Sequence, residues 1–175
     1  MEKYLINERV DVEDADASRA FGKGVRREDY ADTWRNTGNV VLVGLPGSGK
    51  AALAVILAGR TGAQVAVPGD AGGAVSALAG TGSIIVLDDR LVEDPAVRPL
   101  IHGAGKVFYL MADSGTLSDR VAERDGIADR EALWRGMSAR LAVMEPVFCE
   151  VLHFIVPALG TPGDMAGDAL EKIAY

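Results

Sequence analysis

The stretch VVLVGLPGSGKAALAVILAG, residues 40–59, constrains the fold more than any other part of this 175-residue chain. An aliphatic run is followed by a turn that contains three glycines and a lysine, and then by a run rich in alanine and leucine. This order predicts a strand, a glycine-rich turn and a helix. The turn matches the pattern G-x-x-x-x-G-K from Gly44 to Lys50, which is typical of a loop that surrounds phosphate groups.

The residue types in this turn suit phosphate chemistry. Its three glycines permit backbone angles that are closed to residues with a Cβ, so successive N–H groups can turn inward. The following helix adds the positive end of its dipole, and the Lys50 ammonium can reach the outer phosphates. The alternative is a glycine-rich turn with a lysine by chance. We adopt phosphate binding and expect contacts from Gly44, Leu45, Pro46, Gly47, Ser48, Gly49, Lys50, Ala51 and Ala52.

Ala51 occupies the position where such loops normally carry a serine or threonine. In P-loop enzymes this hydroxyl is a ligand of Mg²⁺. Because Mg²⁺ keeps several waters and is held largely by the nucleotide, we expect alanine to impair phosphoryl transfer more than nucleotide binding. Asp88 ends the apolar run SIIVLD and is the candidate to hold a magnesium-bound water. The alternative is that Asp88 only caps the turn that follows.

From Asn39 onward, short β-branched runs alternate with alanine- and leucine-rich segments, which predicts βαβ units and a parallel sheet. We expect one α/β domain with five parallel strands flanked by helices. Gly59 is expected to end the first helix, and Thr116 with Asp119 to begin the fourth. The expected strands are residues 39–43, 64–67, 83–87, 106–111 and 152–156. The expected helices are residues 50–58, 74–78, 95–102, 117–124, 130–143 and 165–174.

Composition narrows the classes of protein to consider. No apolar run approaches the roughly 20 residues of a membrane span, and the charged N-terminus lacks the hydrophobic region of a signal peptide. The single cysteine, Cys149, favours a reducing cytoplasm. A net charge of −7 argues against nucleic-acid binding, which needs clustered lysine and arginine. A small anionic ligand is still compatible, because a nest of backbone amides needs no basic surface.

Residues 1–37 mix both charges, contain few aliphatic residues and show no strand alternation. We interpret them as an N-terminal extension to a domain that spans residues 38–175. A helix is expected at residues 26–34, docked through Tyr30 and Trp34. The extension is either a solvated arm without a role or an arm that binds a partner or a second copy.

Four segments, taken in order, resemble the shikimate kinase family between Asn39 and about Val156. NVVLVGLPGSGKAALAVILAGRTG is similar to its first strand, phosphate loop and first helix. GKVFYLMADSGTLSDRVAERD is similar to its strand and helix before the lid, MEPVFCEVLHFIV to the segment before its last strand, and PALGTPGD to its adenine-side loop. The resemblance implies a P-loop kinase fold, and ATP or ADP with Mg²⁺ as ligands.

The resemblance also implies roles for particular residues in transfer of the ATP γ-phosphoryl group to a small-molecule hydroxyl. Lys50 would stabilise the transferring group, and Pro157 lies in the segment similar to the adenine-side loop. The lid is shortened to ERDGIADRE, which leaves Arg124 and Arg130 as candidates for the arginine that covers the phosphates. Arg124 is our candidate for the second catalytic residue.

The acceptor half departs from the family pattern. In VAVPGD, Val67 and Gly69 stand at the positions of the family's two aspartates, with Asp70 one residue late. The region that carries one substrate arginine is shortened to AGGAVSALAGTG, and the second substrate arginine falls at Met144. The family's triple glycine is replaced by acidic and basic residues, so the candidate contacts for a different, cationic or neutral acceptor are Asp70, Asp88, Asp89 and Arg90.

These departures leave two main hypotheses for function. A site that loses its polar contacts loses roughly 10⁴-fold or more in discrimination, so we expect shikimate phosphorylation to be impaired. The chain is either a kinase for another small hydroxyl compound or a catalytically inactive nucleotide-binding protein that acts through a protein partner. A weaker third hypothesis is a sensor of free phosphate. A polar cavity beside the phosphate loop would favour the kinase.

Overall fold

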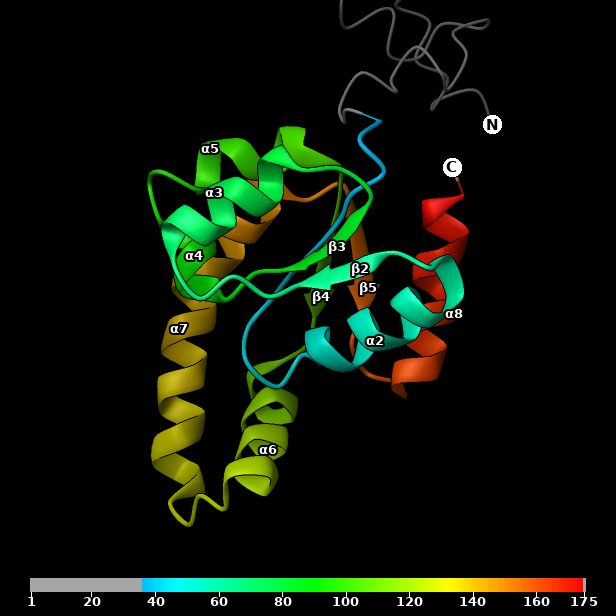
Figure 1. The fold of residues 1–175 in the computed structure, drawn as a ribbon. Helices are drawn as coiled ribbons and strands as arrows, with labels where there is room; N and C mark the ends of the chain where they lie inside the picture. The colour runs from blue at the N-terminus through cyan, green and yellow to red at the C-terminus, as the bar shows by residue number, and fades with distance from the viewer. Residues whose placement is uncertain (1–35, 175) are drawn as a thin grey trace, which may run out of the picture. The chain divides into compact units, whose positions relative to one another are not determined.

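The computed structural model describes residues 36–174, which form a parallel five-stranded sheet with helices on both sides (Figure 1). The strand order is β2-β3-β1-β4-β5, which confirms the predicted fold class. The predicted helix at residues 26–34 lies outside the described residues, and the boundary at residue 37 stays a prediction. The strands are β1 (Val40–Val43), β2 (Gln64–Ala66), β3 (Ser83–Val86), β4 (Lys106–Met111) and β5 (Phe154–Pro157).

Strand β1 lies at the centre of the sheet. Val41 is opposite Ile85 of β3 on one side and Val107 of β4 on the other, and every residue of β1 is buried. Because all strands are parallel, their carboxyl ends meet at one edge, where ligands bind in open α/β sheets. The turn after β1 and the turn after β3 are therefore neighbours at that edge.

Two groups of helices cover the sheet. Helices α2 and α8 pack against each other and against the sheet, whereas α3, α4, α5 and α7 gather on its other side (Figure 1). Helices α6 and α7 form an antiparallel hairpin that projects from the sheet. The helices are α2 (Lys50–Thr61), α3 (Ala71–Ala79), α4 (Asp89–Glu93), α5 (Arg98–Ile101), α6 (Ser114–Asp125), α7 (Arg130–Val151) and α8 (Pro162–Ile173), with a 3₁₀ turn at His102–Ala104.

Several predicted helix boundaries are wrong. Helices α3 and α8 begin at Ala71 and Pro162, three residues before the predicted starts at residues 74 and 165, because Asp70 and Thr161 cap them. Helix α2 runs past Gly59 and ends at Thr61, where Gly62 adopts φ 74° and its N–H donates to Ala58 O at 2.8 Å. Helix α6 begins three residues earlier than Leu117, because Asp113 caps it by accepting the Thr116 N–H at 2.8 Å. Gly62 and Asp113 provide the partners that the terminal backbone groups of a helix need, about one turn beyond the predicted ends.

Three segments differ more strongly from the prediction. The expected helix at residues 95–102 is replaced by α4, which starts directly after β3, and by the short α5. Helix α7 continues through Pro146 and has 22 residues instead of ending at Val143, so β5 starts only at Phe154.

Within residues 36–174, no helix has the length and apolar character that a membrane span requires.

Candidate functional site

The loop between β1 and α2 adopts a conformation that requires glycine. Gly44, Gly47 and Gly49 have φ angles of 148°, 85° and 88°. A Cβ on Gly44 would lie 2.9 Å from Leu110 O, and one on Gly47 would lie 2.6 Å from Leu117 O. The glycines thus allow both the positive φ angles and the close packing of the loop against β4 and α6.

Helix α2 begins without a capping side chain. Its N-cap is Gly49, whereas the other described helices of more than eight residues are capped by side chains of Asp70, Asp113, Asp129 and Thr161. The first N–H groups of a helix have no partner within the helix itself. At α2 these groups and the helix dipole face the turn after β1, which is the arrangement that binds phosphate.

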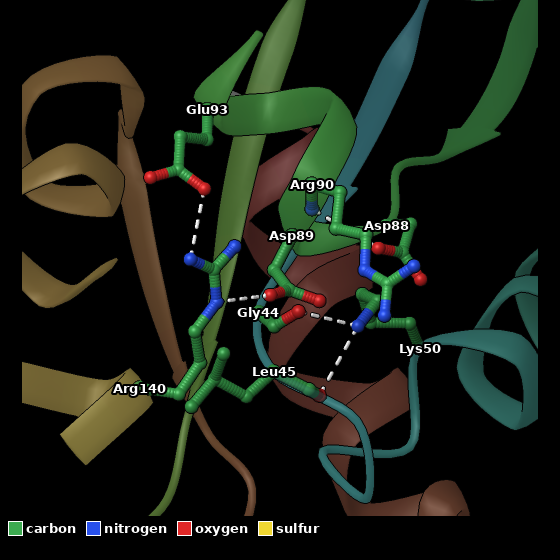
Figure 2. Close-up of polar contacts among 8 residues, drawn as sticks. All are labelled: Gly44, Leu45, Lys50, Asp88, Asp89, Arg90, Glu93 and Arg140. Carbon is green, nitrogen blue, oxygen red and sulfur yellow. Dashed lines mark hydrogen bonds and ion pairs between the residues drawn. The ribbon is translucent and has the colours of Figure 1, made fainter. Parts of the chain in front are cut away.

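The Lys50 side chain folds back over the loop. Its Nζ donates to the carbonyl oxygens of Gly44 and Leu45, the latter at 3.1 Å (Figure 2). Burial lowers the pKa of Lys50 to about 8, and the carboxylates of Asp89 and Asp88 oppose this lowering. The ammonium is therefore held in place by weak neutral acceptors that a phosphate oxygen could replace.

No hydroxyl of the loop stands in for the one that Ala51 lacks. Ala51 is exposed in the first turn of α2. Ser48 carries the one hydroxyl between Gly44 and Ala52, and its side chain is buried with no hydrogen-bond partner for Oγ among the described residues. A Mg²⁺ ligand at this position would need a different residue.

The two neighbouring aspartates at the end of β3 have different partners. Asp88 is exposed and caps α4, accepting the Arg90 N–H at 3.0 Å. Asp89 is 6% exposed and accepts a hydrogen bond from Arg140 Nε on α7 at 2.6 Å. Arg140 Nη1 also lies 2.8 Å from Glu93 Oε2. Asp88 therefore serves the cap that was its alternative role, while Asp89 ties α4 to α7.

A pocket of about 360 Å³ lies beside the phosphate loop. It combines the charged groups of Lys50, Asp88 and Arg90 with apolar walls. Asp70 is not among its lining residues, because it caps α3 and accepts the Gly73 N–H at 2.7 Å. The lining residues are Lys50, Val67, Pro68, Gly69, Val86, Asp88, Arg90 and Leu91.

One of the three arginines considered on the hairpin contacts the loop. Arg120 Nη1 on α6 donates to Gly47 O at 3.3 Å, a contact that the sequence interpretation missed. Its only sequence signal is its position one helical turn before Arg124. Arg124 is paired with Asp125 at 2.7 Å, and its positive charge still acts on the Lys50 ammonium. Arg130 lies at the far end of the hairpin, 3.3 Å from Asp119.

The predicted adenine-side residue lies in a second hollow. Pro157 ends β5 and lines a groove of about 450 Å³ between β5 and α8, together with Gly160, Met165 and Lys172 among others. In this groove Lys172 Nζ donates to Ile155 O at 2.8 Å and pairs with Asp168. The groove is distinct in its lining from the pocket beside Lys50.

The donor set fits one mode of magnesium binding. Residues 36–174 contain no group of three or more His, Cys, Asp or Glu side chains that could hold a metal ion by themselves. Mg²⁺ bound with a nucleotide keeps several waters and takes one or two carboxylates. Asp88, exposed beside Lys50 in the same pocket, matches that requirement.

Comparison with known proteins shows the fold. Neither a family model nor a curated protein matches the sequence. Among solved structures, shikimate kinase from Acinetobacter baumannii in complex with shikimate matches with a TM-score of 0.67 and 18% identity, over 78% of this chain and 92% of that one.

Two further solved structures match over similar lengths. Shikimate kinase from Bacteroides thetaiotaomicron gives a TM-score of 0.68 at 12% identity, over 78% of this chain and 98% of that one. A gluconokinase from Sinorhizobium meliloti 1021 gives a TM-score of 0.59 at 17% identity, over 80% of this chain and 93% of that one. The chain therefore has the fold of P-loop kinases that act on small molecules.

Proposed function

We propose that this chain binds ATP or ADP at the loop between β1 and α2 and transfers a phosphoryl group to a small hydroxyl compound other than shikimate. The observation that carries the proposal is the uncapped start of α2, with Lys50 over the loop and a pocket that joins Lys50 to Asp88. This arrangement offers an anion site and an adjoining space for an acceptor. Similar folds among small-molecule kinases support it.

Each residue has a role in this proposal. ATP supplies the phosphoryl group, and the loop amides with Lys50 stabilise the negative charge of its oxygens. Arg124 adds a second positive charge from α6. Asp88 would hold Mg²⁺ together with the nucleotide, and the metal would offset the negative charge of the phosphates. The acceptor hydroxyl would lie in the pocket between Asp88 and Lys50.

The pocket supports a neutral acceptor. Its walls include Val67, Pro68, Val86 and Leu91, and its carboxylate is matched by the guanidinium of Arg90. Met144, at the position of the family's second substrate arginine, is fully buried. A carboxylate substrate needs arginine forks. With Met144 buried, Arg90 is the one arginine among the lining residues and lies beside the carboxylate of Asp88, which argues against shikimate. The neighbouring Arg90 likewise argues against the cationic acceptor that the acidic residues had left open.

One observation favours the second hypothesis, an inactive nucleotide-binding protein that acts through a protein partner. Ala51 and the buried Ser48 leave the loop without a hydroxyl for Mg²⁺. Phosphoryl transfer depends almost wholly on positioning and electrostatic stabilisation. Loss of the hydroxyl should therefore slow transfer more than it weakens nucleotide binding. In this case the protein would bind ATP but transfer nothing.

Calorimetry separates these functions. ATP and ADP are titrated into the wild type and into Lys50→Ala, with and without Mg²⁺. The proposal expects micromolar binding that Mg²⁺ strengthens and that Lys50→Ala loses. A screen of neutral hydroxyl compounds for acceptor-dependent ADP release then follows, with Asp88→Asn as the variant expected to lose release. Binding without any acceptor-dependent release supports the inactive protein, and no binding in any condition contradicts both.

A further inference from the structure

We propose that Arg140 is a positioning residue that holds the Asp89 carboxylate away from Lys50 and thereby keeps the Lys50 ammonium available to phosphate. The inference rests on the proposed nucleotide binding at the loop. It concerns a residue of α7 that does not line the pocket and that lies 51 positions from Asp89 in the sequence.

Arg140 forms ion pairs with two carboxylates of α4, those of Asp89 and Glu93. Arg140 binds Asp89 through Nε at 2.6 Å and Glu93 through Nη1 at 2.8 Å. The Asp89 side chain is 9% exposed, whereas that of Glu93 is 47% exposed. Glu93 can be solvated by water, but Asp89 depends on a protein partner because a buried carboxylate without one is strongly unfavourable.

Lys50 is the alternative partner for that carboxylate. In Figure 2, Asp89 lies between the Arg140 guanidinium and the Lys50 ammonium. Within residues 36–174, the hydrogen bonds of Lys50 Nζ go to the carbonyl oxygens of Gly44 and Leu45 alone. Among the carboxylates that act on Lys50, Asp89 raises its pKa most. A direct pair between Lys50 and Asp89 would neutralise the charge that phosphate needs.

Stability alone gives little reason for the Arg140 pair. Replacing a buried ion pair with apolar residues of similar volume is often neutral or stabilising. Arg140 Nη2 is also buried without a hydrogen-bond partner among the described residues, so the guanidinium is not fully satisfied. Holding the Asp89 carboxylate away from Lys50 is a reason for an arginine at position 140.

The test compares Arg140→Met with the double variant Asp89→Asn/Arg140→Met. ATP titrations should show about tenfold weaker binding for Arg140→Met, a coupling within the range known for charged neighbours. The double variant should recover wild-type affinity, because Asn cannot pair as an anion with Lys50. Arg135→Met is the matched control: Arg135 is an exposed arginine of the same helix, paired with Glu131, and should change nothing.

A second measurement needs no nucleotide. The Lys50 Nζ is titrated by NMR, with its signal assigned through Lys50→Arg. Arg140→Met should raise the titration midpoint, since a freed Asp89 stabilises the charged lysine, and the double variant should reverse the shift. Asp88 and Arg124, the other charged groups that act on Lys50, are unchanged in every variant. A general loosening of the structure would not reverse on removing Asp89.

The outcomes are distinguishable. If the wild type fails to bind ATP, the proposed function fails, while the NMR titration still tests the relation between Arg140, Asp89 and Lys50. If the midpoint in Arg140→Met equals that of the wild type, the positioning role is overturned. It is also overturned if the double variant, folded by circular dichroism, binds ATP as weakly as Arg140→Met.

Discussion

Arg120 on α6 donates Nη1–H to the carbonyl oxygen of Gly47 at 3.3 Å, and so connects the projecting hairpin to the phosphate loop. The same glycine packs against the backbone of α6, because a Cβ on Gly47 would lie 2.6 Å from Leu117 O. The loop and the first helix of the hairpin therefore form one packed unit. A structural change in the phosphate loop should therefore alter α6, and a change in α6 should alter the loop.

Gly47→Ala should destabilise the protein by about 2 kcal/mol or more, because it adds a clash with α6 to a strained backbone angle. Urea denaturation measures the change. Gly59→Ala is the control: nothing lies within 4 Å of a Cβ there, and alanine within helix α2 should stabilise by about 0.5–1 kcal/mol. Equal effects of the two substitutions would contradict the close packing of the loop on α6.

Nucleotide binding should weaken as pH rises through the Lys50 pKa of about 8, because the ammonium loses its proton. Affinity for ATP should fall several-fold from about pH 7 to about pH 9. Lys50→Met should bind weakly at every pH. A flat wild-type profile measured by calorimetry would show that Lys50 does not contribute a titrating charge.

The stability of the nucleotide-free protein should change in the opposite direction with pH. The folded-state pKa of Lys50, about 8, lies below the ordinary lysine pKa of 10.5, so between these values the unfolded chain binds more protons. The contribution of Lys50 to the free energy of unfolding should therefore rise over this interval. Urea denaturation of the wild type and of Lys50→Met at each pH measures this contribution as the difference between their free energies of unfolding. A difference that does not change with pH would exclude it.

Ala51→Thr should restore a ligand for Mg²⁺ at the start of α2. Mg²⁺ should then strengthen ATP binding about tenfold more than it does in the wild type, since a hydroxyl at this position is a ligand of Mg²⁺ in P-loop enzymes. Ala52→Thr adds the same hydroxyl at the next exposed position and serves as the control. Calorimetry with and without Mg²⁺ decides, and identical responses in the two variants would count against a metal at this turn.

Asn39→Ala should destabilise the domain by about 3 kcal/mol, because it removes three hydrogen bonds that a buried side chain makes to the backbone. Asn39 is 2% exposed, and its Nδ2 donates to Gly80 O at 2.8 Å and Ala104 O at 3.1 Å. Its Oδ1 accepts the Ser83 N–H at 3.0 Å. Gln64→Ala, on the exposed edge strand β2, should change stability by less than about 0.5 kcal/mol. A similar loss in both would remove Asn39 as a link between the strands.

Local patterns made the sheet and the phosphate loop predictable. The aliphatic run before Gly44 and the alanine-rich run after Lys50 each determine their own structure within a few residues. Helix α4 was missed because five residues are too few to show a period, and its start depends on the cap supplied by Asp88. The continuation of α7 through Pro146 was missed because a proline usually ends a helix.

The pairing of charges could not be predicted from the sequence. Asp88 and Asp89 are neighbours of the same type, yet only the packing of α4 against α7 brings Arg140 to one of them. The resemblance predicts Asp70 beside the acceptor because it falls one residue after the position of a family aspartate. It instead satisfies the first turn of α3, a local demand that sequence spacing from a resembling family does not reveal.

Under the proposed function, the hairpin of α6 and α7 would act as the lid over the nucleotide, with only residues 126–129 between its helices. A disordered lid loses conformational entropy each time it closes over a ligand, and that loss weakens the complex. A lid already built from two helices has lost this entropy on folding, so any closure would be a rigid tilt about the hairpin base. Ligand exchange would then follow the microsecond-to-millisecond rates of hinge motion, and amide hydrogen exchange at the tip of the hairpin, residues 126–129, would differ little between the free and bound protein.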